Sequence, residues 1–415
     1  MKKKLLILLS LLMTLALAAC SDNPGPGDET GGAETTEAPA ETTSPVIEEN
    51  PFTVPKDFDE LRKMVIDCFD GMSQIKWKCR DTIDFSKERS YTTKLVYERG
   101  KAYYGLPYTS GRFPKACLNE FTDYLSDSGF YEGPTDYKNI VGSDCGSMRQ
   151  AWAWGGALCG ISIGNTDTTF DMFDNPASKR VKNVIIKVGD YDESNYSYNK
   201  PTAECIIANN DENTIYEAYA LLQPCDLIGS RFRIADNVEQ HVRMVVAPSE
   251  VVRLGNGKIA PSKSSVVFSE QTSTIRNDNG KLTTWALNQK MTFSELLQAG
   301  YLPRTTVTLA GGKIEEPVMT ATGLNKAENL ATASIIKGKI TCNYNIFETE
   351  ITITNTDTGE VVSHALVYPY DLQVMVNEIP LEVKPADLPK GNYRYTLTAT
   401  IGFGTKTLLD ASFSK

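Results

Sequence analysis

Short strand-like segments at regular spacing fill the last part of the chain and restrict what it can fold into. Turn-forming residues such as Asp357-Thr358-Gly359 and Pro389-Lys390-Gly391 separate them. The segments cover 335–344, 348–355, 361–368, 372–376, 393–401 and 406–413. Regular short strands joined by tight turns predict an all-β sandwich of the immunoglobulin-like type. We assign this domain to 306–415, with the strand pattern clear after about Asn325, and interpret His364 inside it as structural.

Residues 51–305 have a different pattern, in which helix-like segments alternate with strands. The helix-like segments cover 58–69, 118–128 and 213–222. Mixed elements of this kind predict an α+β domain. About 365 residues remain once the first 50 are set aside, and that length favours two domains.

The first 20 residues have the three regions of a secretory signal peptide. Lys2-Lys3-Lys4 precedes an apolar run over 5–17, and Leu17-Ala18-Ala19-Cys20 places small residues before a cysteine. The run is too short to cross a bilayer comfortably. This end resembles the lipobox of bacterial lipoproteins, which implies that Cys20 becomes the lipidated first residue of an extracytoplasmic, membrane-anchored protein. An ordinary cleaved signal and an uncleaved anchor are the alternatives.

Residues 21–50 are predicted to be a disordered, acidic tether. The segment is rich in Pro, Gly, Glu and Thr, and it has eight acidic residues but no Lys or Arg. Such a composition cannot bury enough apolar surface to offset the entropy lost on ordering. The tether would hold the folded part away from the membrane without fixing its orientation.

The net charge does not favour nucleic acid as a partner. Of the 52 acidic and 42 basic residues, 8 acidic residues lie in the tether and 3 lysines in the signal peptide, which leaves 44 against 39 and a net charge of −5. Basic residues interleaved with aromatic ones do not form a stripe in the sequence. We therefore expect no binding of nucleic acid, and we expect a monomer.

Cys145 is the strongest candidate for a nucleophile. Small and polar residues, from Gly142 to Ser147, surround it and lead into a helix-like run. At a helix N-terminus, the unpaired backbone N–H groups and the positive end of the helix dipole favour the thiolate over the thiol. The alternative is that Cys145 is a small apolar core residue, which its polar neighbours disfavour.

A thiol nucleophile needs a base, and the chain has two histidines. Because His364 lies in the predicted sandwich, His241 is the ordinary base that remains. His241 begins the strand-like run His241-Val242-Arg243-Met244-Val245-Val246. Its alternative role is that of a hydrogen-bonded strand residue.

The order of several motifs from about 101 to 272 resembles divergent NlpC-type and CHAP-type peptidoglycan hydrolases, which are papain-like. The motifs are Tyr103-Tyr104-Gly105-Leu106-Pro107-Tyr108 followed by Ser110-Gly111, then Asp144-Cys145, Gln223-Pro224-Cys225-Asp226-Leu227-Ile228, His241-Val242 and Val266-Val267-Phe268-Ser269-Glu270-Gln271. In the same order, these motifs are similar to five features of the family. The features are its lead-in, its nucleophile pair, the turn before the histidine strand, the start of that strand, and a later strand that ends in Glu-Gln. The resemblance implies a papain-like fold for 51–305.

The chain also departs from the family pattern. Gly146-Ser147 follows the cysteine where the family usually has Ser-Gly, Cys225 replaces the turn glycine, and Thr272 stands where CHAP-type enzymes have Asn. The separation of Cys145 from His241 exceeds the usual one, and we attribute the excess to an insertion around 165–210.

A third catalytic residue must hold the imidazole in the correct tautomer. Glu270 and Gln271 both offer an acceptor, but strand alternation sends them to opposite faces, so only one can serve. The CHAP-like placement favours Glu270, with Gln271 as the alternative. The resemblance also implies that Tyr108 lies beside the nucleophile and that Asp144 meets a substrate amine, although Asp144 could equally cap a helix.

These residues predict a Cys-His-Glu hydrolase that cleaves an amide bond of peptidoglycan, within the stem peptide or at the muramoyl link. The resemblance implies no cofactor, and the sequence shows none of the usual zinc-ligand spacings. A catalytically silent surface lipoprotein that binds cell wall or another ligand is the first alternative. A thioester-forming acyltransferase is the second.

The remaining cysteines do not suggest a complete disulfide framework. Apart from Cys20 and Cys145, the chain has an odd number of them: Cys68, Cys79, Cys117, Cys159, Cys205, Cys225 and Cys342. A single disulfide bond, such as one between Cys68 and Cys79, is compatible with the sequence.

Substitution of Cys20 tests the lipoprotein interpretation. We expect the wild-type protein to incorporate a fatty-acid probe in cells and to partition into detergent with the membranes. Cys20→Ala should abolish the label and either release the chain or leave its signal uncleaved. A wild-type chain that takes up no label would contradict lipidation.

Overall fold

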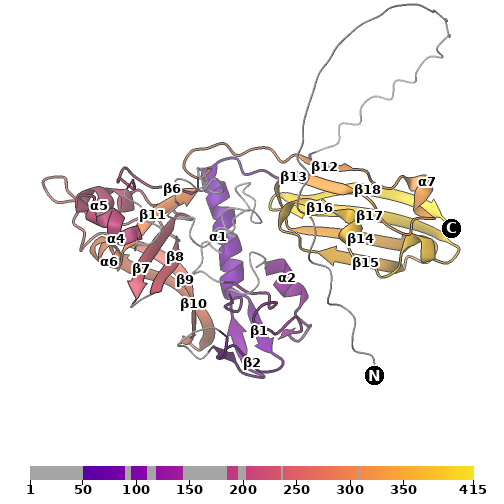
Figure 1. Ribbon diagram of the computed structural model, residues 1–415, viewed down its shortest axis with the longest axis horizontal. Helices are drawn as coiled ribbons and strands as arrows, with labels where there is room; N and C mark the ends of the chain where they lie inside the picture. The colour runs from indigo at the N-terminus through magenta and orange to yellow at the C-terminus, as the bar shows by residue number, and fades with distance from the viewer. Residues whose placement is uncertain are drawn as a thin grey trace, which may run out of the picture. The chain divides into compact units, whose positions relative to one another are not determined.

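The computed structural model describes residues 50–88, 95–109, 118–143, 185–194, 202–234, 237–306 and 308–415. Cys20, Asp144 and Cys145 lie outside the described residues. The protein is mostly β-sheet with few helices, and its C-terminal part is rich in strands (Figure 1). In the described ranges, no helix is long and apolar enough to span a membrane.

The described residues before 307 form a nine-stranded sheet with the order β5-β1-β4-β10-β9-β8-β7-β11-β6. Neighbouring strands are antiparallel, except that β1 pairs with β5 and β4 with β10 in parallel. The strands are β1 Lys76–Cys79, β4 Ala102–Tyr104, β5 Phe130–Tyr131, β6 Ile185–Lys187, β7 Leu227–Ile234, β8 Asn237–Val245, β9 Ser265–Asp278, β10 Lys281–Thr292 and β11 Tyr301–Thr306. A separate pair joins β2 (Ile83–Asp84) to β3 (Val96–Tyr97).

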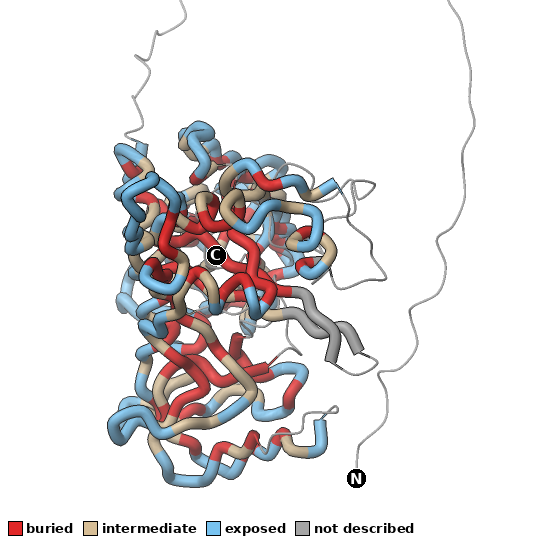
Figure 2. The backbone as a smooth tube through the Cα atoms, turned by 90° about the vertical axis from the view of Figure 1, so that its left-hand side faces the viewer, coloured by how far each residue is buried: buried red, intermediate tan, exposed pale blue. Residues whose placement is uncertain are grey.

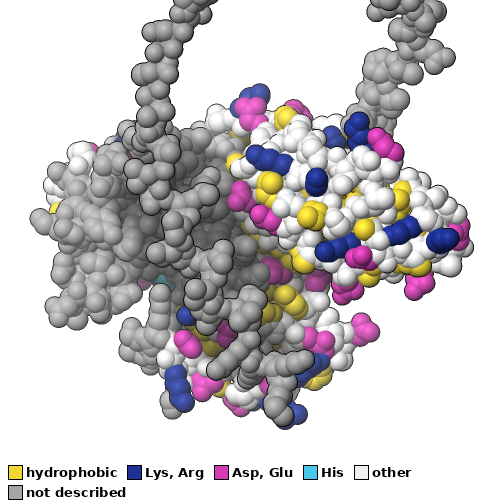
Figure 3. All heavy atoms as spheres, turned by 45° about the vertical axis from the view of Figure 1, so that its right-hand side comes forward, with side chains coloured by type: hydrophobic (Ala, Val, Ile, Leu, Met, Phe, Trp, Pro, Cys, Tyr) yellow, Lys and Arg dark blue, Asp and Glu magenta, His cyan; other side chains and the backbone are white. Residues whose placement is uncertain are grey.

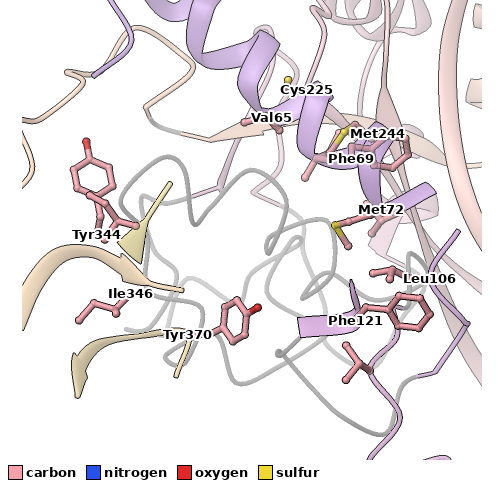
Figure 4. Close-up of a cluster of buried hydrophobic side chains, with 14 of the residues drawn as sticks. Val65, Phe69, Met72, Leu106, Phe121, Cys225, Met244, Tyr344, Ile346 and Tyr370 are labelled. Carbon is pink, nitrogen blue, oxygen red and sulfur yellow. The ribbon is translucent and has the colours of Figure 1, made fainter. Parts of the chain in front are cut away.

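The long helix α1 (Phe58–Gln74) covers part of this sheet. The Asp57 side chain caps its N-terminus by accepting a hydrogen bond from the backbone of Glu60. Apolar residues at helical spacing are buried along one face, among them Val65, Phe69 and Met72. Figure 4 shows these three side chains in the apolar cluster that includes Met244 of β8.

The remaining described helices are short. They are α2 (Leu118–Asp123), α4 (Thr202–Ala208), α5 (Glu212–Ala220), α6 (Phe293–Gln298) and α7 (Ala327–Leu330). Two lie where the sequence predicts helix, but the segment expected over 118–128 ends at Asp123. A turn follows there, in which the Gly129 N–H donates to Ser126 O at 2.7 Å and Gly129 adopts a φ of 77°. The sequence therefore placed the end of this helix too late, and strands dominate the described residues before 307.

A buried ion pair connects α1 to the turn that leads into β7. Arg62 Nη1 lies 2.9 Å from Asp226 Oδ1, and Thr305 Oγ1 donates to the same carboxyl oxygen at 2.7 Å. Burial raises the pKa of Asp226, although the charge of Arg62 opposes the shift. In this turn Cys225 has a left-handed φ of 73°, a conformation that favours glycine.

Two smaller sheets make up the C-terminal part. One has the order β12-β13-β16 and the other β15-β14-β17-β18. Their strands are β12 Met319–Thr322, β13 Lys339–Ile346, β14 Glu348–Asn355, β15 Val361–Val367, β16 Asp371–Met375, β17 Asn392–Ile401 and β18 Gly404–Ser414. Inward residues alternate with exposed ones, and register pairs such as Ile351 with Leu397 are fully buried. Across the described residues as a whole, buried segments are surrounded by exposed turns (Figure 2).

The predicted strands agree with the structure except near the start of this part. The strand predicted over 348–355 is confirmed as β14. The sequence pattern, which is clear after about Asn325 and starts with the run 335–344, missed β12, and β13 begins at Lys339. β12 has only four residues, and its pairing with β13 defines it as a strand. The described residues of the segment treated as an insertion, 165–210, form β6 and α4, so this segment also contributes to the large sheet.

Cleavage between the two regions tests the predicted domain boundary near 306. Residues 50–415 group as one compact unit, yet none of the described strands before 307 shares a sheet with a later one. We expect a site for a sequence-specific protease, inserted between Gly311 and Gly312, to yield two pieces that each unfold cooperatively.

The matched control is the same insertion between Asn279 and Gly280, in the turn that connects β9 to β10. Cleavage there interrupts a hairpin of the large sheet, so it should destabilise the N-terminal region and leave the C-terminal one intact. Loss of cooperative unfolding in both pieces after cleavage near Gly311 would show that 50–415 folds as a single unit.

Candidate active site

The candidate site lies where β8 and β9 meet. The two strands pair in antiparallel orientation at Met244 with Ser269 and at Val245 with Phe268. One step further along this register, Arg243 of β8 lies opposite Glu270 of β9. His241 is two residues from Arg243 and therefore on the same face of the strand. Strand alternation thus brings one acidic and two basic side chains together on one face of the sheet.

His241 and Glu270 form a short hydrogen bond. Nε2 of His241 lies 2.6 Å from Oε2 of Glu270. The His241 side chain is 20% exposed and that of Glu270 is 13% exposed. The pair therefore lies partly buried, in an environment in which electrostatic interactions are stronger than in bulk water.

The same oxygen of Glu270 accepts a second hydrogen bond. Arg243 Nε donates to Oε2 at 2.8 Å. Burial by itself would raise the pKa of Glu270, but the hydrogen bonds and positive charges of His241 and Arg243 outweigh burial and lower this pKa to about 2. An ionised carboxylate can only accept, so the proton of a neutral His241 ring lies on Nε2. The other ring nitrogen, Nδ1, is then the acceptor of the ring.

Aromatic rings hold Arg243 in place. Its guanidinium carbon lies 4.3 Å from the centre of the Phe268 ring and 4.1 Å from the centre of the Tyr301 ring. Such cation–π contacts contribute roughly 0.5–2 kcal/mol each, depending on desolvation. Tyr301 also presents its ring perpendicular to that of His241, with 6.4 Å between the ring centres.

Gln271 makes its hydrogen bonds on the other face of β9. Its Nε2 donates to Leu106 O at 2.9 Å and to Thr284 Oγ1 at 3.0 Å. Its Oε1 accepts a hydrogen bond from Ser143 Oγ. The side chain is fully buried. Gln271 is therefore committed to the loops that contain Leu106 and Ser143, whereas Glu270 contacts the histidine.

The segment just before Cys145 is fixed against the lead-in motif. Ser143 N donates to Pro107 O at 2.8 Å, and Thr109 N donates to Ser143 O at 2.9 Å. Tyr108 forms a parallel bridge with Ser143. A Cβ atom on Gly142 would lie 2.4 Å from Pro107 O, so this close approach requires glycine.

The structure thus brings together some of the predicted site residues. His241 and Glu270 are in direct contact, and Tyr108, only 7% exposed, lies beside Ser143, two residues before the proposed nucleophile. Asp144 and Cys145 lie outside the described residues. His364 forms an exposed pair with Glu350 on the C-terminal sheet, at 2.9 Å.

The sequence reasoning missed Arg243. Its signal was present, since a basic residue two positions after the histidine shares the same strand face. Recognising its role required the register between β8 and β9, which the sequence pattern does not give.

The cysteines in the described ranges are not in disulfides. They are Cys68, Cys79, Cys205, Cys225 and Cys342, so the pair of Cys68 with Cys79 does not form. Burial raises the pKa of Cys68 and of Cys79 to about 11. Among the residues that the structure describes, no cluster of three or more His, Cys, Asp or Glu side chains could hold a metal ion.

Comparisons with known proteins add little to this geometry. No family model and no curated protein matches the chain. Among solved structures, a tetra-tandem repeat in the extending region of a large adhesion protein is similar at 16% identity, over 47% of this chain and 42% of that one. The TM-score of 0.18 is too low to indicate a shared fold.

The lowered pKa of Glu270 predicts a specific loss of stability in acid. A carboxylate whose pKa is lower in the folded than in the unfolded protein stabilises the fold above its unfolded pKa, and this contribution disappears as the pH falls towards about 2. It amounts to at most about 3 kcal/mol. We expect the free energy of unfolding, measured with urea, to fall less between pH 5 and pH 2 in Glu270→Gln than in the wild type.

Glu350→Gln is the matched control, because it removes the carboxylate of the other Glu–His pair. That pair is about half exposed, and exposed ion pairs contribute little. The free energy of unfolding of Glu350→Gln should therefore depend on pH as that of the wild type does. If Glu270→Gln also followed the wild type, Glu270 would not be held as an ionised, buried carboxylate.

Proposed function

We propose that the protein is a lipid-anchored, extracytoplasmic cysteine hydrolase that cleaves an amide bond of peptidoglycan. In this proposal Cys145 is the nucleophile, His241 the general base and acid, and Glu270 the residue that orients His241. The observation that carries the proposal is the 2.6 Å contact of Glu270 with Nε2 of His241, because it leaves Nδ1 available to a thiol.

The chemistry follows the general cysteine hydrolase scheme. Nδ1 of His241 takes the thiol proton of Cys145, and the thiolate attacks the amide carbonyl. His241 then protonates the leaving amine, which breaks the C–N bond and leaves a thioester. His241 next deprotonates a water molecule that hydrolyses this thioester. Glu270 stabilises the imidazolium, and backbone N–H groups at Cys145 would donate to the oxyanion.

The position of Ser143 is compatible with this role for Cys145. Gln271 anchors Ser143, and Gln271 is the immediate neighbour of Glu270 on β9. A step from residue 143 to residue 145 covers up to about 7 Å of extended chain. Gln271 and Glu270 face opposite sides of β9, so Ser143 and His241 lie on different faces of the sheet. The proposal therefore requires that the thiol of Cys145 approaches His241 past the end of the short ladder between β8 and β9.

Two further features support a papain-like domain. The lead-in motif on and after β4, the histidine strand β8 and the Glu-Gln strand β9 all belong to one sheet. Cys225 adopts the left-handed conformation that the family's glycine would favour at this turn. These placements agree with the order of motifs that the sequence shares with NlpC-type and CHAP-type hydrolases.

For the C-terminal part we propose an immunoglobulin-like sandwich. Its seven strands lie in two sheets, and Tyr393, at the start of the sixth strand, donates from its hydroxyl to Pro389 O at 3.0 Å. Such a tyrosine corner is a hallmark of this fold. Basic and acidic side chains are interspersed on the face of this part seen in Figure 3, which favours a partner other than nucleic acid.

The reactivity of Cys145 tests the proposed function. We expect iodoacetamide to alkylate Cys145 at neutral pH at least about tenfold faster than Cys68 and Cys79, whose thiols are protonated by burial. His241→Ala should remove this difference. Purified protein should release soluble fragments from cell walls, whereas Cys145→Ala should release none.

Cys68→Ala is the matched control, since it removes a thiol that burial keeps protonated, and it should leave wall release unchanged. Equal alkylation rates for all cysteines, together with wall binding but no release, would favour the catalytically silent surface protein. Acyl transfer to an added amine without net hydrolysis would favour the acyltransferase.

A further inference from the structure

Arg243 shares one carboxylate oxygen with the proposed base. Its Nε donates to Oε2 of Glu270 at 2.8 Å, and Nε2 of His241 meets the same atom at 2.6 Å. A glutamate carboxylate has several rotatable bonds and two equivalent oxygens. With His241 as its only donor, Glu270 could meet the ring with either oxygen or turn towards solvent. The second donor selects one arrangement.

Arg243 is itself held by groups other than Glu270. Its guanidinium lies between the rings of Phe268 and Tyr301, and Nη1 donates to the sulfur of Met291 at 3.0 Å. The side chain is 15% exposed. These contacts come from β9, β10 and β11, so the sheet fixes the guanidinium in place and Glu270 aligns to it.

The charged surroundings of His241 are simple. Among the described side chains, Glu270 of β9 and Arg243 of β8 are the ionised groups that form the cluster with it, and Tyr301 of β11 contributes a ring edge. A change of the His241 tautomer after substitution of Arg243 would therefore report the placement of Glu270.

We propose that Arg243 is a positioning residue that fixes the Glu270 carboxylate on Nε2 of His241, so that Nδ1 is the nitrogen presented to the reacting thiol. Its catalytic consequence rests on the proposed hydrolase function, but the positioning itself does not. Arg243 contacts the orienting carboxylate and none of the proposed reacting atoms.

Imidazole NMR on the full-length protein tests this role directly, because the chain has two histidines. His364→Asn removes the second one and assigns the signals. At a pH at which the His241 ring is neutral, its ¹⁵N chemical shifts should show the Nε2–H tautomer in the wild type. Arg243→Met, which keeps an apolar side chain between the two rings, should convert this to a mixture of tautomers. Arg243→Lys lacks the planar guanidinium and should give a smaller shift in the same direction.

Arg394→Met is the matched control. Arg394 also donates its Nε to a carboxylate, Asp410 Oδ1 at 2.7 Å, between neighbouring strands, but that pair lies on the exposed face of the C-terminal sheet. The His241 tautomer should not change in this variant. If Arg243→Met folds and keeps the wild-type tautomer, the proposal is wrong and Arg243 is only a packing residue. If Arg243→Met does not fold, Arg243→Lys decides, and a wild-type tautomer there overturns the proposal.

Kinetics separate this inference from the proposed function. If Cys145→Ala abolishes wall release, Arg243→Met should lower kcat by roughly 10²-fold with little change in KM, because a misplaced base slows the chemical step. If the wild-type protein releases nothing from walls, the hydrolase proposal fails, whereas the tautomer measurement still decides the role of Arg243.

Discussion

Neighbouring residues of β9 face opposite sides of the sheet, and the candidate site depends on this alternation. Glu270 points to the face that contains His241, whereas Gln271 points to the face that contains Ser143. A period of two residues is intrinsic to an extended chain. One strand therefore supports the proposed base from one side and the loop before the proposed nucleophile from the other.

Burial distinguishes the two Glu–His pairs of the protein. Glu270 with His241 and Glu350 with His364 have similar distances, 2.6 and 2.9 Å. The charges of a buried pair must be compensated by hydrogen bonds, and removing one partner of a buried ion pair costs about 3–5 kcal/mol. An exposed pair is solvated by water and contributes at most about 1 kcal/mol. Arg243 supplies the additional compensation that Glu270 needs.

The strand that carries His241 is positioned from a distance by α1. The Arg62–Asp226 pair ties this helix to the turn before β7, and β7 pairs with β8 through His241 opposite Ser230. Because Asp226 is buried, its carboxylate depends on Arg62 and Thr305 for compensation. The Arg62–Asp226 pair does not contact His241, but it helps to fix β7, and β7 in turn fixes the strand that contains His241.

The local sequence pattern predicted those features of this protein that depend on residues close together in the chain. The strand pattern predicted β14 and the opposite faces of Glu270 and Gln271, because side-chain direction in a strand repeats every two residues. It also predicted a strand at His241, but β8 begins at Asn237, so His241 lies within the strand and does not begin it. The order of charged, apolar and small residues set the expectation of a signal, and composition set the expectation of a tether. The tertiary structure decided which strands are neighbours and in what register, and therefore that Arg243 meets Glu270 and that four residues form β12. Register depends on packing between distant segments, and a slip of one residue would turn each of these side chains to the other face.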